Sequence, residues 1–409
     1  MVIPSMDVCV STDARTMLSD DGSLWTEISG FGVEDYRRYL SVFDTVRLVT
    51  RAKKTSCPPD TAFPVTRPGI VGVPVPYFSG AGEFMLKRAR IRMRIREELD
   101  RNAAVILRAP HVLSFEIFRM LRGTRRPFGV EVVGDPWDAF QPGSIKTLLR
   151  PYLRLLFRSL LVEMCRRACA VAYVTENELQ KSYPPPPSAF TTHYSSIELD
   201  EDMLRARSRV HSDPPYVIFH AGTMSTMYKS QDVLIQAVKR LVERGMDVRL
   251  RLAGSGKYAE SFRRLARDLG ILDRVDFLGQ LAGTSAVMAE MDRATLFVLP
   301  SKTEGLPRVL IEAMARGLPC LGSDVGGIRE LLEPEDRFEL KNAGAIERKM
   351  WDVLNDQNRM ARMAERNLLK ASQYRKDILQ KRRVEFYKRI KQATTEWIEK
   401  EKSLGISAR

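Results

Sequence analysis

Two glutamates in the segment 301–332 stand in a context that suits the binding of a phosphate and of paired hydroxyl groups. Glu304 follows an apolar strand pattern, Gly305 and Pro307 shape a turn, and Glu312 lies in the helical pattern that comes next. An ionised carboxylate accepts two hydrogen bonds side by side, as the hydroxyls of a ribose or another sugar offer them. The start of a helix presents free N–H groups and a positive dipole end to a phosphate. The eight-residue spacing alone is no evidence for a binding site. The evidence is the turn and the helix start that accompany it.

The helix expected over 306–316 has two chemically different faces. A helical wheel places Arg308 and Glu312 on one side, and Glu304 would join them if the helix were extended backward. The other side is apolar and suits packing on a sheet: Leu306, Val309, Leu310, Ala313 and Met314. The competing interpretation of the polar face is a solvated ladder of ion pairs, each worth a few tenths of a kcal/mol.

The elements that position these residues alternate regularly between strand and helix patterns. In the second half, strands are expected at 216–222, 248–254, 274–279, 294–301 and 319–323, with helices at 231–244, 258–269, 284–292, 306–316 and 326–332. The first half contains five further strand patterns, DVCVST, TVRLVT, AAVILRAP, FGVEVVGD and AVAYVTE. This alternation predicts an α/β fold with parallel sheets, in which ligands bind outside the carboxyl ends of the strands.

Composition limits the number of domains and the class of protein that the chain can form. The 409 residues, with 44% hydrophobic and 28% charged residues, predict two domains with substantial cores. No apolar run approaches the ~18 residues of a membrane span, and the start of the sequence lacks a secretory pattern, so we expect a cytoplasmic protein. Five scattered cysteines and four scattered histidines indicate reduced thiols and no metal site.

Six ordered motifs make the segment 216–332 resemble the donor-binding domain of glycosyltransferase family 4, the retaining transferases of GT-B fold. The E-x7-E motif runs from Glu304 to Glu312. The others are AMARGLP, a GG-x-x-E run at Gly326–Glu330, LAGSG at 252–256, RVDFLG at 274–279 and LFVLPS at 296–301. The first half is similar to the acceptor domain of bacterial envelope and exopolysaccharide members, through EVVGDPWDAF (131–140) and AYVTENELQKSYP (172–184).

The resemblance implies roles for individual residues. Glu312 matches the glutamate that holds the ribose hydroxyls of the nucleotide. Glu304 matches the glutamate that faces the donor sugar, with the backbone N–H groups of Gly305 and Leu306 nearby. Lys229, in GTMSTMYKSQD, matches the lysine that neutralises the pyrophosphate. Catalysis is thus expected from Glu304 and Lys229, with no cofactor and no metal.

The sequence departs from the family pattern at the cationic side of this site. Members usually have an arginine soon after the glycine of the lysine segment, where this chain has Thr223 or Met224. Arg308 stands where most members have an apolar residue, one helical turn from both glutamates. Arg308 is either a substitute donor-binding cation or one partner of a surface salt bridge.

Two residues of the first domain receive no assigned role. Many relatives place a histidine ahead of an aspartate after the strand FGVEVV, whereas here Gly134 precedes Asp135. Asp135 therefore either faces the acceptor hydroxyl or forms a turn. His111, in RAPHVLSF, suits a structural position better than a catalytic one.

The implied architecture is GT-B, with two Rossmann-like domains facing each other across a cleft. We expect an acceptor-side domain over 1–205, a nucleotide-sugar-binding domain over 206–375 and a helical tail over 376–409 that crosses back to the first domain. The implied activity moves a hexose-like sugar from a UDP- or GDP-sugar to a lipid-linked or polysaccharide acceptor, with retention of configuration. This would serve the synthesis of cell-envelope or exopolysaccharide material.

The net charge of +14 calls for an anionic partner. A helix expected within 145–167 places Lys146, Arg150, Arg154 and Arg158 four residues apart, beside a broad apolar face. Such a helix fits the surface of an anionic membrane, and predicts a peripheral protein on the inner face of the cell membrane. The alternative is a buried domain helix with a solvated basic edge. A second basic segment, 87–101, is also expected to be helical.

Two other functions are compatible with parts of the sequence. A nucleotide-sugar epimerase would keep the fold, but needs a set of acid–base residues facing the sugar that the sequence does not offer. A nucleic-acid-binding protein would explain the positive charge. No zinc finger, helix-turn-helix or aromatic RNP-like strand pattern supports that function, so we expect no nucleic-acid partner.

Overall fold

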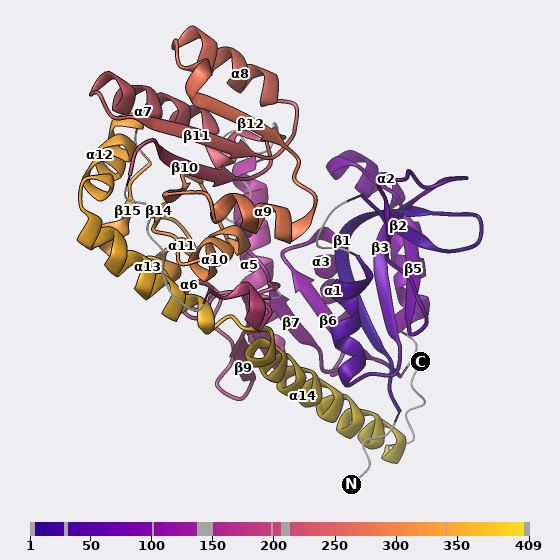
Figure 1. The fold of residues 1–409 in the computed structure, drawn as a ribbon. Coiled ribbons are helices and arrows are strands. Elements are labelled where there is room, and N and C mark those ends of the chain that lie inside the picture. Colours follow the sequence, from indigo (N-terminus) through magenta and orange to yellow (C-terminus); the bar gives the residue numbers. More distant parts are fainter. Residues whose placement is uncertain are drawn as a thin grey trace. The chain divides into compact units, whose positions relative to one another are not determined.

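The computed structural model describes residues 5–27, 32–99, 102–136, 150–197, 199–205, 213–340 and 342–404. The chain divides into two compact units, each built around its own sheet (Figure 1). Unit 1 comprises residues 1–135, 155–194 and 380–409, and unit 2 comprises residues 136–154 and 195–379. Both units are α/β, as the alternation of strand and helix patterns predicts. No described helix is long and apolar enough to cross a membrane.

The sheet of unit 1 is parallel at its centre and antiparallel at one edge. Its core order is β5-β3-β1-β6-β7-β8-β9, and β2 and β4 add an antiparallel extension to the end of β1. The strands are β1 (Val8–Leu18), β2 (Leu24–Thr26), β3 (Val46–Lys54), β4 (Phe63–Pro64), β5 (Ile70–Pro76), β6 (Ala104–Ala109), β7 (Gly129–Val132), β8 (Ala170–Tyr173) and β9 (Phe190–His193). All four residues of β7 and of β8 are buried, as expected for central parallel strands that carry near-continuous apolar runs.

The helices of unit 1 include both basic segments identified in the sequence. Its helices are α1 (Val33–Arg37), α2 (Gly80–Leu99), α3 (Val112–Leu121), most of α5 (Arg150–Arg167), α6 (Glu178–Ser182) and most of α14 (Lys376–Ser403). The helix expected over 87–101 is confirmed as α2, although it begins at Gly80. The first five residues of the expected 145–167 helix lie outside the described residues, and the rest forms α5.

The C-terminal helix α14 packs on unit 1, as the fold predicts. Gly129 of β7 permits this contact, because a Cβ there would lie 2.1 Å from Cδ1 of Ile390. The ring of Tyr387 packs against Tyr39 at a centroid separation of 4.8 Å, and Lys391 donates a 2.9 Å hydrogen bond to the carbonyl of Val42. The apolar stripe of this helix is therefore part of the core of unit 1.

A buried carboxylate, Glu131 on β7, organises the polar contacts beneath α14. It accepts hydrogen bonds from the hydroxyls of Tyr39 and Tyr194 at 2.7 Å each, and from that of Tyr387 at 3.4 Å. Arg108 lies 3.4 Å from its carboxylate. Burial alone would raise the pKa of Glu131, but Arg38 and Arg108, together with the hydrogen bonds from Tyr39 and Tyr194, outweigh it and hold this pKa below its usual value. Glu131 is therefore an ionised, fully partnered group inside unit 1.

Unit 2 is a six-stranded parallel sheet among the described residues, in the order β12-β11-β10-β13-β14-β15. Its strands are β10 (Tyr216–Ala221), β11 (Val248–Ala253), β12 (Val275–Gly279), β13 (Leu296–Leu299), β14 (Cys320–Ser323) and β15 (Arg337–Phe338). Its helices are α7 (Gln231–Glu243), α8 (Ala259–Asp268), α9 (Gly283–Met291), α10 (Arg308–Ala315), α11 (Ile328–Leu331), α12 (Ala343–Leu354) and α13 (Gln357–Ser372). Every strand and helix expected between 216 and 332 is present, with ends that differ by at most two residues.

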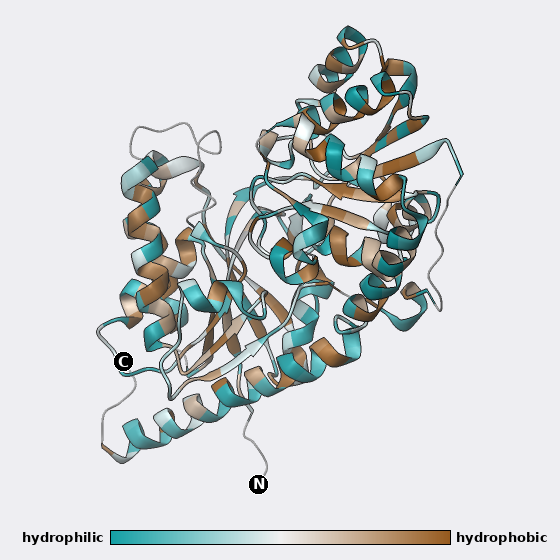
Figure 2. Cartoon of the chain, turned by 90° about the vertical axis from the view of Figure 1, so that its left-hand side faces the viewer, coloured by the Kyte–Doolittle hydropathy of each residue, from teal (hydrophilic) through white to brown (hydrophobic). Residues whose placement is uncertain are grey.

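Hydropathy follows this layering in both units. Figure 2 shows hydrophobic residues concentrated in the strands, while α14 alternates between hydrophobic and hydrophilic residues along its length. Parallel strands are buried on both faces by helices, which is why their patterns are apolar throughout, whereas a helix on the surface keeps a polar side.

Candidate functional site

The candidate site lies where the strand order of unit 2 reverses. Strands β10 and β13 are neighbours, but the chain leaves β10 toward β11 on one side and leaves β13 toward β14 on the other. The two loops that follow β10 and β13 therefore diverge at the carboxyl end of the sheet. This is the topological switch point, where open parallel sheets bind their ligands.

Lys229 and Glu304 meet at this switch point, although they are 75 residues apart in the sequence. Lys229 ends the short 3₁₀ helix Met227–Lys229 after β10, and its Nζ donates a hydrogen bond to Oε1 of Glu304 in the loop after β13. Each side chain is only 10% exposed. Burial alone would lower the pKa of Lys229, but Glu304 and Tyr228 outweigh it and raise this pKa, so the lysine is a cation.

Two glycines in the turn between β14 and α11 pack against the backbone of the Glu304 loop. A Cβ at Gly326 would lie 1.9 Å from the carbonyl oxygen of Glu304, and one at Gly327 would lie 2.0 Å from that of Gly305. The backbone N–H of Gly327 donates a 2.8 Å hydrogen bond to the Gly305 carbonyl. The GG-x-x-E run therefore has a mechanical role, because a larger residue at either glycine would displace the glutamate loop.

The same device operates on the other side of the site. Gly254 has φ +135°, and a Cβ there would lie 2.1 Å from the carbonyl oxygen of Gly222. Gly256 has φ +147°, and a Cβ there would lie 2.2 Å from the backbone nitrogen of Ser225. These values explain the LAGSG motif: its glycines let the loop after β11 lie directly against the loop after β10, which leads to Lys229.

The backbone ahead of α10 provides hydrogen-bond donors. Gly305 and Leu306 are half-buried, and no described residue accepts a hydrogen bond from the N–H group of either one. The helix begins at Arg308, two residues later than the sequence pattern predicts, with Pro307 as its N-cap residue. These N–H groups and the start of the helix form an arrangement that suits an anionic group.

Glu312 and Arg308 lie one turn apart on α10 but differ in their surroundings. Glu312 is partly buried, and burial raises the pKa of its carboxyl, while the nearby charge of Arg308 acts in the opposite direction. Arg308 is exposed, and no ion pair joins it to another described residue. The salt-bridge ladder considered for this face is therefore absent among the described residues, and Arg308 keeps an accessible charge.

His220 is a residue of this site that sequence reasoning missed. It is fully buried in β10, and its Nδ1 lies 2.9 Å from the carbonyl oxygen of Val298. Burial lowers its pKa to about 4, so the ring is neutral, and its Nε2 has no hydrogen-bond partner among the described residues. A Cβ at Gly222 would lie 3.2 Å from Nε2, which places the ring directly beneath the loop that leads to Lys229. A histidine within an apolar strand pattern was the only signal in the sequence.

The two residues of the first domain without an assigned role have structural contacts. Asp135 accepts a hydrogen bond from the hydroxyl of Tyr183, and His111 is the N-cap residue of α3. The structure therefore gives Asp135 a partner within unit 1. Among the described residues, no three His, Cys, Asp or Glu side chains gather to hold a metal ion, and the five cysteines form no disulfide.

Comparison with known proteins finds matches to part of the chain and to most of it. Residues 202–369 match the family described as "Glycosyl transferases group 1". Protein CapJ of Staphylococcus aureus is 25% identical over 319 residues, which cover 76% of this chain and 78% of that protein. A GDP-mannose-dependent alpha-(1-6)-phosphatidylinositol monomannoside mannosyltransferase of Mycobacterium tuberculosis is 31% identical, but the match covers only 36% of this chain and 39% of that protein.

A solved structure extends the likeness to both units. HepE of Anabaena, crystallised in complex with UDP, superposes with a TM-score of 0.64 at 14% identity, covering 93% of this chain and 98% of that chain. At this identity the likeness shows the fold alone. The chain therefore has the GT-B fold with two parallel-sheet domains, and its residues 202–369 are similar to the glycosyl transferases group 1 family.

Proposed function

We propose that this protein is a glycosyltransferase that moves a hexose-like sugar from a UDP- or GDP-sugar to a lipid-linked or polysaccharide acceptor, with retention of configuration. The observation that carries the proposal is the Lys229–Glu304 pair at the switch point of a group 1 glycosyltransferase domain. Relatives support the substrate classes: HepE was crystallised with UDP, and the Mycobacterium protein is named for GDP-mannose and a phosphatidylinositol mannoside. Relatives named for a phosphatidylinositol mannoside and for lipopolysaccharide support a role in envelope or exopolysaccharide synthesis.

The reaction needs two charges to be stabilised. When a sugar leaves a nucleoside diphosphate, negative charge grows on the pyrophosphate and positive charge on the sugar ring. Lys229 and the N–H groups of Gly305 and Leu306 would meet the negative charge, as preorganised donors aimed at the place where charge develops. Glu304 would face the sugar, and Glu312 would accept hydrogen bonds from the ribose hydroxyls. No step assigned to these residues requires a metal or a cofactor.

The proposal is tested by ligand stabilisation of the intact chain. In a thermal-shift panel of UDP, GDP, ADP and their sugar conjugates, at least one nucleoside diphosphate is expected to raise the melting temperature. A ligand at 100 times its dissociation constant stabilises the folded state by ~2.7 kcal/mol. Glu312→Ala is expected to remove the shift for both the nucleotide and its sugar conjugate, because both contain the ribose. A panel without any shift, or an unchanged shift in Glu312→Ala, would contradict the donor-site assignment.

The same residue predicts how nucleotide affinity depends on pH. Ribose hydroxyls need the ionised carboxylate, and burial raises the pKa of Glu312. Affinity is therefore expected to fall, as the solution is acidified, at a higher pH than an ordinary glutamate would give. Glu312→Gln removes this titration, so its affinity should be weaker than that of the parent at neutral pH and nearly flat across the same range.

Arg308 is proposed to supply part of the cationic clamp that the family pattern provides elsewhere. Its guanidinium is exposed on the first turn of α10 and forms no ion pair with the described part of the chain, which supports this role. Arg308→Ala is expected to lower the transfer rate at least as much as Lys229→Ala does, and Arg308→Lys to restore part of the loss, because a lysine keeps the charge but not the fork. Steady-state kinetics decide the matter: unchanged kinetics in Arg308→Ala would leave Arg308 as a plain surface residue.

We also propose that the protein works at the cytoplasmic face of an anionic membrane, held there by α5. Lys146 lies outside the described residues, but Arg150, Arg154 and Arg158 lie on this helix. The first half of α5 exposes Tyr152 (63%) and Leu155 (60%) beside these arginines. The second half packs into the core of unit 1 through Leu160, Leu161, Met164 and Cys165. A basic half with exposed apolar side chains, joined to a buried half, suits a surface contact that the fold itself anchors.

Vesicle co-sedimentation tests this contact. The parent is expected to bind anionic vesicles and not neutral ones, and to detach as salt rises, because exposed charges are screened over ~8 Å at physiological ionic strength. Glutamate at positions 146, 150, 154 and 158 is expected to abolish binding, since each basic residue near the surface is worth about 1 kcal/mol. A matched control reverses four exposed cations at and before α8: Lys257, Arg263, Arg264 and Arg267. Equal loss in both variants would show that only net charge matters and would remove α5 from the proposal.

A further inference from the structure

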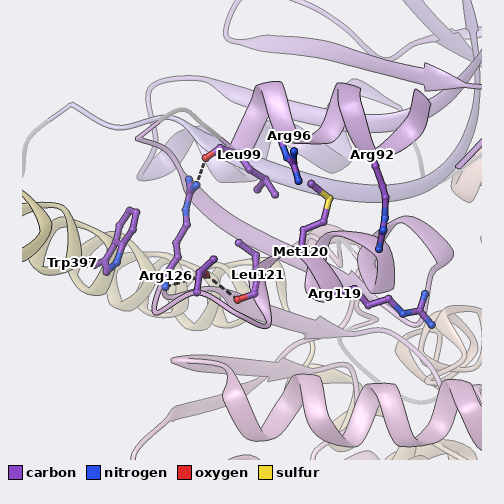
Figure 3. A pocket seen from close by; sticks show the side chains of 9 residues that line it. Arg92, Arg96, Leu99, Arg119, Met120, Leu121, Arg126 and Trp397 are labelled. Carbon is purple, nitrogen blue, oxygen red and sulfur yellow. Dashed lines mark hydrogen bonds between the residues drawn. The ribbon is translucent and has the colours of Figure 1, made fainter. Parts of the chain in front are cut away.

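Unit 1 contains a pocket of about 490 Å³. None of the residues assigned above to the donor site lines it. It lies between α2, α3 and α14 (Figure 3). Nine described residues line it: Arg92, Arg96, Leu99, Arg119, Met120, Leu121, Thr124, Arg126 and Trp397. Four of the nine are arginines and none is acidic, so the pocket is a concave surface of one charge. We refer to it below as the arginine pocket.

The arginines reach the pocket from three different segments. Figure 3 shows the side chains of Arg92 and Arg96 descending from α2 toward α3, which carries Arg119 and Met120. Arg126 follows α3 and donates hydrogen bonds to the last carbonyl of α2, at Leu99, and to the carbonyl of Ala103. Because helices, and not long loops, position three of the four guanidinium groups, their convergence is a property of the fold of unit 1.

One buried carboxylate explains only part of this charge. Glu116 on α3 is fully buried and pairs with Arg88 at 3.1 Å, with Arg119 at 3.3 Å and with Arg92. It thus offers one negative charge to three cations, from beneath them. Arg96 is exposed and forms no ion pair with a described residue. The ion pairs with Glu116 therefore explain why Arg92 and Arg119 are arginines. They do not explain why residue 96 is an arginine.

An apolar stripe runs along α2 beside the pocket. Met85 (61% exposed), Leu86 (88%) and Met93 (63%) are among the most exposed large hydrophobic residues of unit 1. At 100° per residue, Met85 and Met93 lie on the same side of the helix as Arg96, with Leu86 next to them. Trp397 adds an aromatic surface at the far wall, where the guanidinium of Arg126 lies 5.4 Å from the centre of its ring. The site thus combines convergent cations with neighbouring apolar surface.

We propose that the arginine pocket binds a phosphate group, distinct from that of the sugar donor, on an amphiphilic or soluble phosphorylated ligand. Arginine is the side chain best suited to this chemistry, because its planar fork gives two parallel hydrogen bonds to phosphate oxygens. A phosphate monoester carries about −1.5 to −2 charges at neutral pH, which would neutralise part of the positive charge that Glu116 leaves uncompensated. The apolar stripe gives a lipid-borne phosphate a place for its chain, and a soluble phosphate would use the pocket alone.

The direct test compares two charge reversals on the same helix. Arg96→Glu places a carboxylate in the pocket, whereas Arg90→Glu makes the same change of net charge on the opposite flank of the stripe, since Arg90 is exposed and lies about 120° from Arg96 around the helix. Calorimetric titration of the full chain with inorganic pyrophosphate is expected to give at least tenfold weaker binding for Arg96→Glu, a change of ~1.4 kcal/mol, and less than a twofold change for Arg90→Glu.

Pyrophosphate could also reach Lys229, so the comparison is repeated in a Lys229→Met background. The difference between Arg96→Glu and Arg90→Glu is expected to persist there, because the two sites lie in different units. This separates the inference from the proposed function: loss of the donor site would leave the pocket intact, and failure of the pocket would leave donor binding intact. Equal affinity of the two charge reversals for pyrophosphate, in either background, would overturn the inference.

A vesicle arm distinguishes the two sources of phosphate. Phosphatidylcholine vesicles with one fifth phosphatidic acid present an exposed phosphate monoester on a lipid. If the ligand is lipid-borne, Arg96→Glu binds these vesicles at least tenfold more weakly than Arg90→Glu does. If the two reversals bind them equally but differ toward pyrophosphate, the pocket serves a soluble phosphate compound. Equal affinity of the two variants for pyrophosphate overturns the inference whatever the vesicles show.

Discussion

Replacing Glu304 with glutamine is expected to lower the rate of sugar transfer at least 100-fold, while the affinity for the plain nucleoside diphosphate changes less than about threefold. The separation arises because Glu304 is assigned to the sugar, and the nucleotide lacks the sugar. Loss of one preorganised electrostatic group in an active site typically costs 10²–10³ in turnover. The measurement combines initial rates with a donor sugar and calorimetry with the free nucleotide.

Glutamine is the informative substitution because of the contact with Lys229. Each of the two side chains is only 10% exposed, and removal of one partner of a buried ion pair leaves an uncompensated charge that costs about 3–5 kcal/mol. Glutamine also removes the charge, but it keeps a hydrogen-bond acceptor for the Nζ of Lys229, so the loop after β13 should be disturbed less than in Glu304→Ala. Glu304→Ala is expected to lose turnover as well, but with a lower melting temperature, which would mix a stability effect with the catalytic one.

A nearby control separates the sugar contact from general damage to the loop. Lys302 is exposed and lies in the same loop, two residues before Glu304, so Lys302→Gln changes a charge there without touching the pair. Its transfer rate is expected to stay within about twofold of that of the parent. If Glu304→Gln also transferred sugar at the rate of the parent, Glu304 would not be a catalytic residue, whatever its place beside Lys229.

The sequence predicts the second half of this fold well because two periodicities coincide there. Parallel strands buried on both faces are apolar throughout, and the helices between them show a single apolar stripe, so each element is recognisable by itself. The structure adds the reason for the motifs. Gly326 and Gly327 are required by contacts with the backbone of Glu304 and Gly305, which no local pattern shows. Spacing could indicate that these residues belong together, but not that one loop holds the other.

The first half is harder to predict because the contacts that define its fold join residues far apart in the sequence. Strand β1 is long and pairs with β2, β3 and β6, and the antiparallel extension that this makes possible has no signature of its own in the pattern. The apolar stripe of α14 is visible in the sequence. The groups of unit 1 to which this helix forms hydrogen bonds are not. Glu131, within the strand pattern FGVEVV, is an isolated charge in an apolar run, and only the assembled unit shows why it is there.

The burial of His220 shows the same limit at the candidate site. In the sequence His220 is a single histidine near the end of an expected strand. Nothing in the spacing of the other residues indicates its hydrogen-bond partner. In the structure its ring fills the space beneath Gly222, and the carbonyl of Val298, 78 residues away, is its hydrogen-bond partner. Contacts across neighbouring parallel strands join residues far apart in the chain, so a single sequence does not reveal them.

Glu131→Ala is expected to destabilise unit 1 by about 3–5 kcal/mol, because it removes one partner of a buried ion pair. Arg108, which is 7% exposed, would keep its charge without the carboxylate, and the hydroxyls of three tyrosines would lose their shared acceptor. Hydrogen exchange is the suitable measurement, since it reports each unit separately. Protection is expected to fall in β7 and α14 and to persist in the strands of unit 2, where the nucleotide is proposed to bind.

The pH dependence of this loss identifies the charge as its cause. The pKa of Glu131 is lowered in the folded protein, so its contribution to stability is fully present above the pKa of the unfolded chain and is lost as pH falls through the lower, folded value. The difference in stability between the parent and Glu131→Gln is therefore expected to be constant near neutral pH and to shrink in acid. Tyr387→Phe, which removes only the longest hydrogen bond at 3.4 Å, should cost much less and show no such dependence. If the difference between the parent and Glu131→Gln were equal at every pH, the carboxylate would act through its shape and hydrogen bonds alone, and the buried ion pair would have no role in holding α14 to the sheet.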